Sequence, residues 1–375
     1  MQRRRRRRRS TAENPSLSSI LPDELVEAIL LRLPVSSLLR FKCVSKLWLS
    51  LISNPQFAKS QFDLAASPTH RLLLNCTDDS QIQSLDIESS PPNDDESAAV
   101  LNYTYVNMFY RFITSLEVLG SCRGFLLFLL PNFPPDYIVC NPATGVQRRI
   151  RSTRFRYSNY LYGIGYDEST DDYLLVAITS CHFWPTIELF SLRTNVPFSL
   201  RLKGKYRYIN LKFDCRSGLF LNGSLHWLVT VTSSDTNPRV LLAFDLVSKS
   251  LSEIALSPGL ALELNKGSYC LREMRGCVGL CYSGYGEMAE IWIMKEYKVQ
   301  SSWTKIVLSY DILSAPRFFP ICFTKCGDVF GSNVDGRLLR LNNEGKTIAF
   351  WPPGESKYRS LYSCMYTASL LSLPS

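Results

Sequence analysis

Residues 138–145, Ile-Val-Cys-Asn-Pro-Ala-Thr-Gly, show most clearly the pattern that predicts the fold of the long C-terminal region. Three apolar residues predict a buried strand, and the Asn-Pro-Ala-Thr-Gly that follows contains the residue types that form tight turns. The same order of strand and polar turn returns at Leu189–Asn195, Ala243–Lys249 and Leu339–Gly345. Ile291–Met294 supplies an apolar strand in the remaining gap of this series. The pattern indicates a repeating unit.

A second series of apolar strands recurs out of phase with the first. Its members begin near Leu72, Gly124, Tyr173, Leu221, Val278 and Asp328. Successive starts are therefore 52, 49, 48, 57 and 50 residues apart. A repeat of about 50 residues with several short strands is typical of one four-stranded propeller blade, and about 300 residues hold about six of them.

We therefore predict a mainly β protein, in which residues 70–371 form a β-propeller of about six blades. Radially arranged blades leave few exposed strand edges, which favours closure into a ring. The last strand, around residues 362–371, is expected to pair with the first blade. A pair of two-sheet sandwiches is the competing architecture, but it would explain the recurring spacing less well.

Residues 19–64 have a different texture, because their apolar side chains recur at helical spacing. A first helix is expected to begin at Pro22, because proline suits the first helical position. Serine caps at Ser36 or Ser37, and at Ser45, would begin two more helices. A three-helix module of this size buries little apolar surface by itself and often depends on a partner. The pattern therefore predicts a small α-helical docking module before the propeller.

This module resembles the F-box. The resemblance is carried by the segments Leu21–Leu25 and Ile29–Trp48, which agree with the family in residue type and spacing. It implies that the module binds a Skp-type adaptor and, through the adaptor, a cullin. The residues that the resemblance assigns to adaptor binding are Leu21, Pro22, Leu25, Leu38, Leu39, Val44 and Trp48. Each of these side chains could instead pack inside the module.

The C-terminal region resembles the F-box-associated domain of plant F-box proteins, which is related to kelch-type propellers. The resemblance lies in residues 120–124, 141–145, 162–167 and 222–227, although the double glycine of a regular kelch repeat is not evident in each unit. It implies the substrate-recognition subunit of a Skp–cullin–F-box ubiquitin ligase, whose propeller recruits a protein target for ubiquitination. An F-box scaffold or regulator that acts outside a ligase is the alternative.

Aromatic and arginine residues cluster in segments that we predict to be propeller loops. Loops at one face of a scaffold commonly carry binding residues, and aromatic and arginine side chains are the usual anchors. Packing between blades is the alternative role for each of them. The candidate target-binding residues are Tyr105, Phe109, Arg154, Tyr157, Phe183, Trp184 and Tyr206.

The sequence contains no arrangement of residues typical of an enzyme. It has neither a Gly-x-Ser-x-Gly motif nor a phosphate-binding loop, and its three histidines lie far apart. Two cysteine pairs, Cys277 with Cys281 and Cys322 with Cys326, have three-residue gaps but no further ligand nearby, so they are more typical of structural cysteines than of zinc sites. We expect a non-catalytic subunit with no metal and no cofactor. The alternative that would be an enzyme is a kelch-like oxidase, but the sequence contains no set of catalytic residues for it.

The positive charge is concentrated at the N-terminus. The formal net charge is +9, and Arg3–Arg9 carry seven of these charges, so the remaining residues carry 9 − 7 = +2. Nucleic acid is therefore an unlikely partner for the folded body. Residues 1–18 are expected to be disordered. The alternatives for this tail are a nuclear-import signal, a tether to nucleic acid or to an anionic surface, and a plain solvated segment. With no apolar run of roughly 18 residues and no secretory signal, we expect no membrane partner and a cytoplasmic or nuclear protein.

Overall fold

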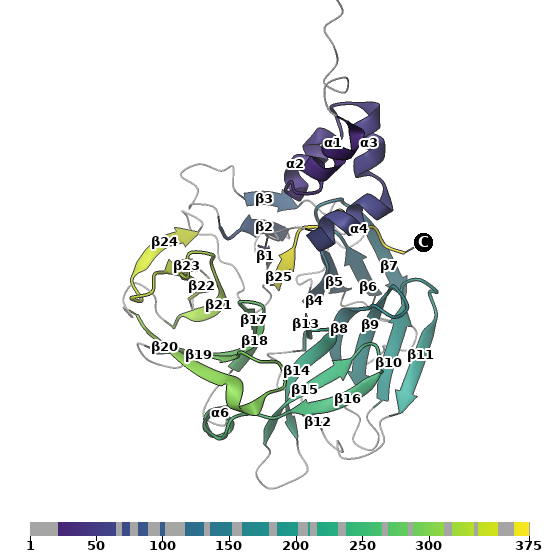
Figure 1. Ribbon diagram of the computed structural model, residues 1–375. Coiled ribbons are helices and arrows are strands. Elements are labelled where there is room, and N and C mark those ends of the chain that lie inside the picture. The colour runs from purple at the N-terminus through teal and green to yellow at the C-terminus, as the bar shows by residue number, and fades with distance from the viewer. Residues whose placement is uncertain are drawn as a thin grey trace, which may run out of the picture. The chain divides into compact units, whose positions relative to one another are not determined.

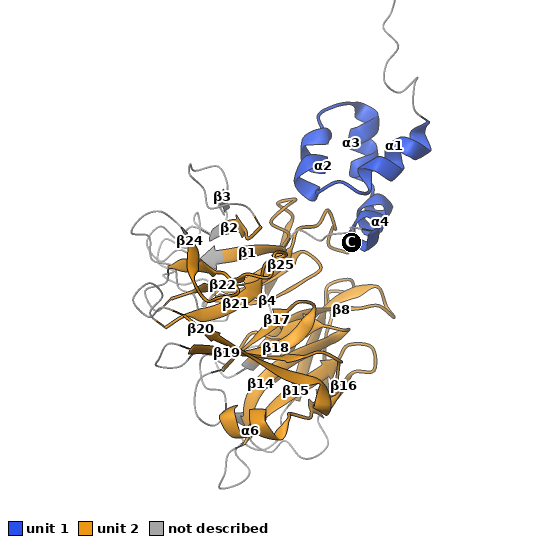
Figure 2. Cartoon of the chain, turned by 60° about the vertical axis from the view of Figure 1, so that its left-hand side comes forward, with its two compact units in different colours: residues 1–68 blue, residues 69–375 orange. Residues whose placement is uncertain are grey.

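The computed structural model describes residues 22–64, 70–75, 82–88, 98–101, 117–130, 136–151, 160–179, 186–201, 209–210, 216–231, 238–264, 269–283, 288–310, 317–333, 337–351 and 364–374. The chain divides into two compact units, Met1–Pro68 and Thr69–Ser375 (Figure 2). None of the described helices is long and apolar enough to cross a membrane.

The described part of the first unit contains four helices. These are α1 (Asp23–Leu30), α2 (Val35–Phe41), α3 (Lys46–Ile52) and α4 (Pro55–Leu64). The three expected helices are present, although α1 begins one residue later than expected, with Pro22 as its N-cap. Ser45 caps α3 by accepting a hydrogen bond from the backbone N–H of Trp48 at 3.1 Å. The first turn of α2 differs from expectation, since the helix begins directly after Pro34 and neither Ser36 nor Ser37 is its cap.

The fourth helix begins at Asn54-Pro55 and was not expected from the sequence. Asn54 Oδ1 accepts a hydrogen bond from the backbone N–H of Gln56 at 2.7 Å, which caps the new helix. Pro55 occupies its first position, where a missing N–H costs nothing. The buried core of the unit comprises Leu30, Val35, Leu38, Ile52, Phe57 and Ala58.

In the described residues of the second unit, the strands form six antiparallel sheets, here called blades 1 to 6 (Figure 1). Blade 1 contains β25 (Cys364–Thr367), β1 (His70–Asn75), β2 (Ile82–Asp86) and β3 (Ala98–Leu101). Blade 2 contains β4 (Glu117–Cys122), β5 (Phe125–Leu130), β6 (Asp136–Cys140) and β7 (Gln147–Arg151). Blade 3 contains β8 (Tyr160–Asp167), β9 (Asp172–Thr179), β10 (Thr186–Ser191) and β11 (Pro197–Arg201).

The other three blades have the same antiparallel order. Blade 4 contains β12 (Ile209–Asn210), β13 (Leu219–Leu221), β14 (Ser224–Val231), β15 (Arg239–Asp245) and β16 (Ser250–Ile254). Blade 5 contains β17 (Tyr269–Met274), β18 (Cys277–Ser283), β19 (Met288–Met294) and β20 (Trp303–Ser309). Blade 6 contains β21 (Phe319–Phe323), β22 (Val329–Ser332), β23 (Leu338–Leu341) and β24 (Thr347–Trp351). A short helix that the sequence analysis did not anticipate, α6 (Pro258–Leu264), joins blades 4 and 5, and a 3-10 turn (Gln300–Ser302) precedes β20.

The two repeating series correspond to equivalent strands of the blades. The series that begins near Leu72 becomes the second strand of each blade, namely β1, β5, β9, β14, β18 and β22. The series that includes residues 138–145 becomes the third strand in blades 2 to 6, namely β6, β10, β15, β19 and β23. These strands lie between two neighbouring strands and pack on neighbouring blades, which accounts for their continuous apolar runs.

The hydrophobic core lies in layers between neighbouring blades. One cluster joins blades 3 and 4 through Trp227 and Leu189, and the next joins blades 4 and 5 through Leu241 and Trp292. Further clusters join blade 5 to blade 6, blade 6 to blade 1 and blade 1 to blade 2. Blades 2 and 3 meet through the hydroxyl groups of Tyr137 and Tyr162, 3.3 Å apart. This succession of contacts closes the ring and confirms the six-bladed propeller.

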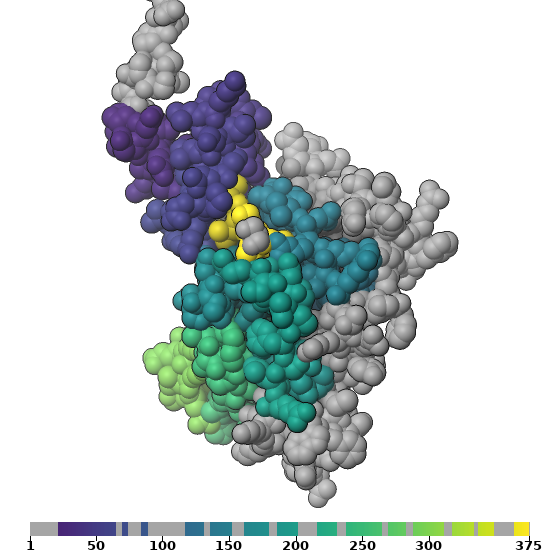
Figure 3. All heavy atoms as spheres, turned by 90° about the vertical axis from the view of Figure 1, so that its right-hand side faces the viewer, coloured from purple at the N-terminus to yellow at the C-terminus, as the bar shows by residue number. Residues whose placement is uncertain are grey.

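Ring closure is made by the C-terminus, as expected. Strand β25 pairs antiparallel with β1, with Leu72 opposite Met365, and so completes blade 1. The chain then continues over blade 2, where Asn141 Nδ2 donates hydrogen bonds to the carbonyl oxygens of Ser369 at 3.0 Å and Leu371 at 2.9 Å. Figure 3 shows these yellow C-terminal residues lying against the blue-teal residues of blade 2.

The ring has two faces with different connections. The turns between the first and second strands of blades 2 to 6, such as Arg123–Gly124 and Asn222–Gly223, lie at one face, here called the turn face. The third and fourth strands of those blades are also joined there. The opposite face, here called the loop face, holds the strand ends that lead from the second to the third strand and from one blade to the next.

Candidate functional site

The helical unit exposes several large apolar side chains. In α1, Leu25 is 51% exposed and Ile29, one helical turn later, is 52% exposed. Val44, just before α3, is 60% exposed, and Leu47 and Leu49 within α3 are 52% and 47% exposed. We call these five residues the exposed apolar set. Large apolar side chains left exposed on a small unit are typical of a surface that a partner covers.

The predicted adaptor-binding residues fall into three groups. Pro22, Leu25 and Val44 are exposed, whereas Leu39 and Trp48 are half-buried. Leu38 is fully buried in the helical core, so its side chain supports the fold of the unit rather than its surface. Leu21 lies outside the described residues.

Sequence reasoning missed three members of the exposed apolar set, namely Ile29, Leu47 and Leu49. A signal for two of them was present in the sequence. Leu47 and Leu49 flank Trp48, and three consecutive helical positions point in directions about 100° apart, so one buried face cannot hold all three side chains. Trp48 turns inward, and its ring meets that of Phe41 edge-on at 5.4 Å, which leaves the two leucines outside.

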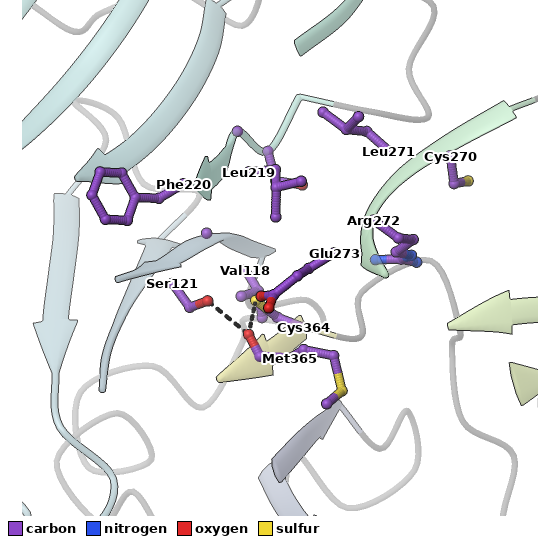
Figure 4. Close-up of a pocket in the computed structure, with 13 residues that line it drawn as sticks. Val118, Ser121, Leu219, Phe220, Cys270, Leu271, Arg272, Glu273, Cys364 and Met365 are labelled. Atoms are coloured by element: carbon purple, nitrogen blue, oxygen red, sulfur yellow. Dashed lines mark hydrogen bonds between the residues drawn. The ribbon is translucent and has the colours of Figure 1, made fainter. Parts of the chain in front are cut away.

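The second candidate site lies where the innermost strands of the propeller meet. A cavity of about 90 Å³ is enclosed by β4, the segment 217–220, β17 and β25 (Figure 4). Backbone hydrogen bonds hold the segment 217–220 against blade 3, since the N–H of Gly218 donates to the carbonyl oxygen of Tyr162 at 2.6 Å. Trp227 Nε1 donates to the same carbonyl at 3.0 Å. A side chain at Gly218 would collide with the Trp227 ring, which explains why a glycine stands there.

A larger cavity of about 200 Å³ opens between blades 1, 5 and 6. It is lined by His70, Ile87 and Glu88 of blade 1 and by the turns after β17 and β21, all of which belong to the turn face. Glu273 and Met365 line both cavities, so the larger one leads into the centre of the ring from the turn face. These two residues are 92 positions apart in the sequence (365 − 273), and no local signal links them.

Burial controls the ionisation of the groups around the centre. It raises the pKa of Glu117, at the loop-face end of β4, although Arg216 stands 4.0 Å away and acts in the opposite direction. Burial likewise raises the pKa of the thiols of Cys281, Cys322 and Cys364, so these cysteines are held as neutral thiols. A thiol held in the protonated form is a poor nucleophile and a poor metal ligand.

The two cysteines of each pair with a three-residue gap differ in how deeply they are buried. Cys281 is buried on β18 and Cys277 is half-buried at the start of that strand. Cys322 is buried on β21, whereas Cys326 is exposed in the turn that follows. Among the described residues, no group of three or more His, Cys, Asp or Glu side chains is arranged to hold a metal ion.

The predicted target-binding residues all lie outside the described residues. These are Tyr105, Phe109, Arg154, Tyr157, Phe183, Trp184 and Tyr206. Every described strand end that flanks their segments belongs to the loop face, from the end of β3 and the start of β4 to the end of β11 and the start of β12. The proposal that these residues bind a target stays a prediction.

Comparison with known proteins agrees with both units. Residues 18–60 match the F-box domain model, and residues 74–366 match the model described as the F-box associated beta propeller domain. An F-box/kelch-repeat protein of Arabidopsis thaliana is 29% identical over 318 residues, covering 76% of this chain and 79% of that protein. The Arabidopsis thaliana F-box protein CPR1 is 26% identical over 370 residues, covering 91% of this chain and 83% of its own.

Among solved structures, a chain of a nidogen/laminin complex matches with a TM-score of 0.45 and 12% identity, covering 81% of this chain and 100% of that one. The propeller domain model, by contrast, spans well over half of the sequence. The chain therefore belongs to the F-box proteins whose C-terminal region is an F-box-associated β-propeller domain.

Proposed function

We propose that this chain is the substrate-recognition subunit of a Skp–cullin–F-box ubiquitin ligase. In this role the helical unit binds a Skp-type adaptor, the adaptor binds a cullin, and the propeller holds a protein target. The chain contributes proximity, because it places an acceptor lysine of the target near the conjugating enzyme and so raises the effective concentration of the reacting groups. This role needs no catalytic side chain in the chain itself.

The observation that carries this proposal is the exposed apolar set on a unit that matches the F-box domain. Burial of apolar area stabilises association by roughly 25 cal/mol per Å², and a few central apolar anchors dominate most interfaces. Leu25, Val44 and Leu47 are each at least half exposed and thus free to serve as such anchors. Protein targets suit the propeller, because six blades offer a broad rigid surface with connections at both faces.

The test is co-purification of the full chain with a Skp-type adaptor and a cullin. The double substitution Val44→Asp with Leu47→Asp places two charges in the exposed apolar set, where they cost the fold little because both side chains face solvent. The matched control is Leu262→Asp in α6, a leucine that is 69% exposed in the other unit. Circular dichroism reports whether each variant is folded.

We expect the adaptor and the cullin to co-purify with the wild-type chain and with Leu262→Asp, and to be lost from the double variant. If several adaptor paralogues fail to bind at micromolar concentration, the proposal is wrong. If the adaptor binds but no cullin follows it, the chain acts as an F-box scaffold outside a ligase instead.

A further inference from the structure

The most informative unassigned feature of the propeller is the pair of cavities that meet at Glu273. This residue lies on β17, the innermost strand of blade 5, two residues before the turn-face residue Arg275. It therefore stands deeper in the ring than the turn. In Figure 4 its side chain extends across the smaller cavity toward Val118 and Cys364 on the opposite wall.

The Glu273 carboxylate is half-buried, and it makes no hydrogen bond or ion pair with any residue that the structure describes. The other carboxylate of the larger cavity is engaged, since Glu88 accepts a hydrogen bond from the backbone N–H of Lys325 at 3.0 Å. In blade 6, Asp328 just before β22 pairs with Arg340 of β23 at 2.8 Å. Pairing with a cation stabilises a carboxylate that is partly withdrawn from water, because the attraction between the two charges is less screened there than in solvent.

The neighbouring Arg272 does not form an ion pair with Glu273. Successive side chains of a strand point to opposite sides, so the two residues diverge from adjacent positions on β17. Figure 4 shows the Arg272 side chain lying over its own strand while Glu273 points away from it. Arg272 acts electrostatically on the thiols of Cys322 and Cys364. It lowers their pKa values, although burial raises them more strongly.

The walls of the larger cavity suit an aliphatic chain. Ile87, Met365 and Phe323 line it with apolar surface, and Ile87 is 1% exposed. Pockets for whole small molecules usually enclose about 300–1,000 Å³. The volume here is about 200 Å³, which suits one side chain better than a complete small-molecule ligand.

The rim carries two basic side chains beside Glu88. Arg275 is exposed at the turn face with its guanidinium 4.1 Å from the centre of the Phe323 ring, and Lys325 is exposed on the next turn. A ligand that matches this layout has a cationic group at the end of an aliphatic stem and an acidic group beside it. A lysine or arginine side chain within an acidic stretch of polypeptide has this chemistry.

We infer that the turn-face cavity receives a basic side chain of the protein target, with Glu273 pairing its cationic group and Arg275 and Lys325 attracting acidic neighbours. The inference rests on the proposed function, because it assumes that the propeller holds a protein. According to this inference, the target binds at the turn face through complementary charges. The target-binding residues predicted from the sequence belong instead to segments whose flanking strand ends lie at the loop face.

The experiment uses the full-length chain expressed together with the adaptor, whether or not the adaptor stays bound, and the tripeptide acetyl-Glu-Lys-Glu-amide as the probe. Isothermal titration calorimetry compares this peptide with acetyl-Glu-norleucine-Glu-amide, which keeps the stem and lacks the ammonium group, and with free butylamine. The protein variants are Glu273→Gln, which preserves shape, and Glu296→Gln, which removes the same charge from an exposed turn residue outside both cavities.

We expect the lysine peptide to bind the wild-type chain and Glu296→Gln equally. Replacing lysine by norleucine, or Glu273 by Gln, is expected to weaken binding by about ten-fold or more, because each change removes one partner of a charge-assisted hydrogen bond. Equal binding of the norleucine peptide, unchanged binding by Glu273→Gln, or no binding at millimolar concentration would overturn the inference. Butylamine that binds as tightly as the peptide would overturn it in favour of a small amine.

The two proposals fail separately. Glu273 lies in the propeller and the exposed apolar set lies in the helical unit, so adaptor co-purification is read from the same preparation without reference to the peptide. A chain that binds the adaptor but no lysine peptide refutes only this inference, and loss of the adaptor refutes the proposed function.

Discussion

His226 of blade 4 and Tyr297 of blade 5 are joined by a hydrogen bond of 2.9 Å between the imidazole Nε2 and the phenol oxygen. The other ring nitrogen, Nδ1, lies 3.1 Å from the carbonyl oxygen of Leu219, and His226 has no solvent exposure. Burial lowers the pKa of His226 to about 4, with Lys298 acting in the same direction and the Leu219 carbonyl against it. One buried imidazole thus links two blades while it remains neutral.

This arrangement predicts that the propeller loses stability on mild acidification. The folded pKa of about 4 lies below the unfolded value of about 6.5, so the unfolded state binds the proton more readily. Stability is complete above pH 6.5 and falls as the pH drops toward 4, by about 3 kcal/mol from this residue. Urea unfolding of the wild-type chain and of His226→Gln, followed by tryptophan fluorescence from pH 7 to pH 4, measures the difference in slope. Identical slopes would show that His226 is not the group responsible.

A second prediction concerns the C-terminal residues that cross blade 2. Asn141 is fully buried and donates to the carbonyl oxygens of Ser369 and Leu371, while its Oδ1 accepts from the backbone N–H of Ala143. Asn141→Ala leaves buried carbonyl oxygens without a donor and is expected to cost about 2–3 kcal/mol in the free energy of unfolding.

The matched control for this change is Asn342→Ala in the equivalent turn of blade 6. Asn342 Oδ1 accepts from the backbone N–H groups of Glu344 and Lys346, both of which belong to its own turn. Its replacement is expected to cost about 1 kcal/mol, as for the loss of a local turn contact. Equal losses in the two variants would mean that the C-terminal residues add nothing to the role of Asn141.

The parts of the propeller that could be predicted from the sequence are the strands that other strands flank. Such a strand is buried on both faces and becomes an apolar run, as in Phe125–Leu130, where every residue is buried. The outer strand Gln147–Arg151 buries only Ile150, and its charged residues gave no recognisable pattern. The inner strand of blade 4 is divided into Ile209–Asn210 and Leu219–Leu221, each too short for a periodic signal.

In the candidate sites, too, the features with a local sequence signal could be predicted and those that depend on long-range packing could not. The helical unit was recognised because its helices have local apolar stripes, yet the exposure of Ile29 depends on how α1 packs within the unit. The turn-face cavity depends on ring closure, which brings Met365 beside Glu273 from a distant part of the chain. One sequence without related sequences has no signal for such a long-range pair, so Glu273 could be found only in the structure.

A third prediction compares two glycines at equivalent turn-face positions. Gly124 has φ +89° and Gly223 has φ +69°, and both follow a residue that also has positive φ. A Cβ atom at Gly124 would lie 2.6 Å from Cβ of Ser369 and 3.0 Å from the carbonyl oxygen of Thr367, whereas a Cβ atom at Gly223 would meet nothing within 4 Å.

Gly223→Ala is therefore expected to cost about 1 kcal/mol from the positive φ alone. Gly124→Ala should cost about 1–3 kcal/mol more, because the C-terminal residues must shift. Urea unfolding of both variants gives the difference. Equal destabilisation would show that the residues after β25 move aside without cost.

The last prediction concerns the ion pair that joins blades 3 and 4. Lys249 Nζ lies 2.6 Å from Oδ2 of Asp167, whose side chain is 3% exposed. Burial acts to raise the pKa of Asp167, but hydrogen bonds from Lys249 and Ser169 outweigh burial and lower the pKa to about 2. Asp167 therefore stabilises the fold above about pH 4, and this contribution is lost as the pH falls through 2.

Lys249→Met removes the cation and leaves a buried carboxylate, so it should raise the pKa of Asp167 and cost about 2–3 kcal/mol at pH 7, the lysine being partly exposed. The matched control is Arg193→Met, whose partner Asp171 is exposed and whose loss should cost less than about 1 kcal/mol. Adding Asp167→Asn to Lys249→Met should recover part of the loss, because no charge is then left unpaired. A double variant no more stable than Lys249→Met alone would place the cost in lost packing of the lysine stem rather than in the stranded carboxylate.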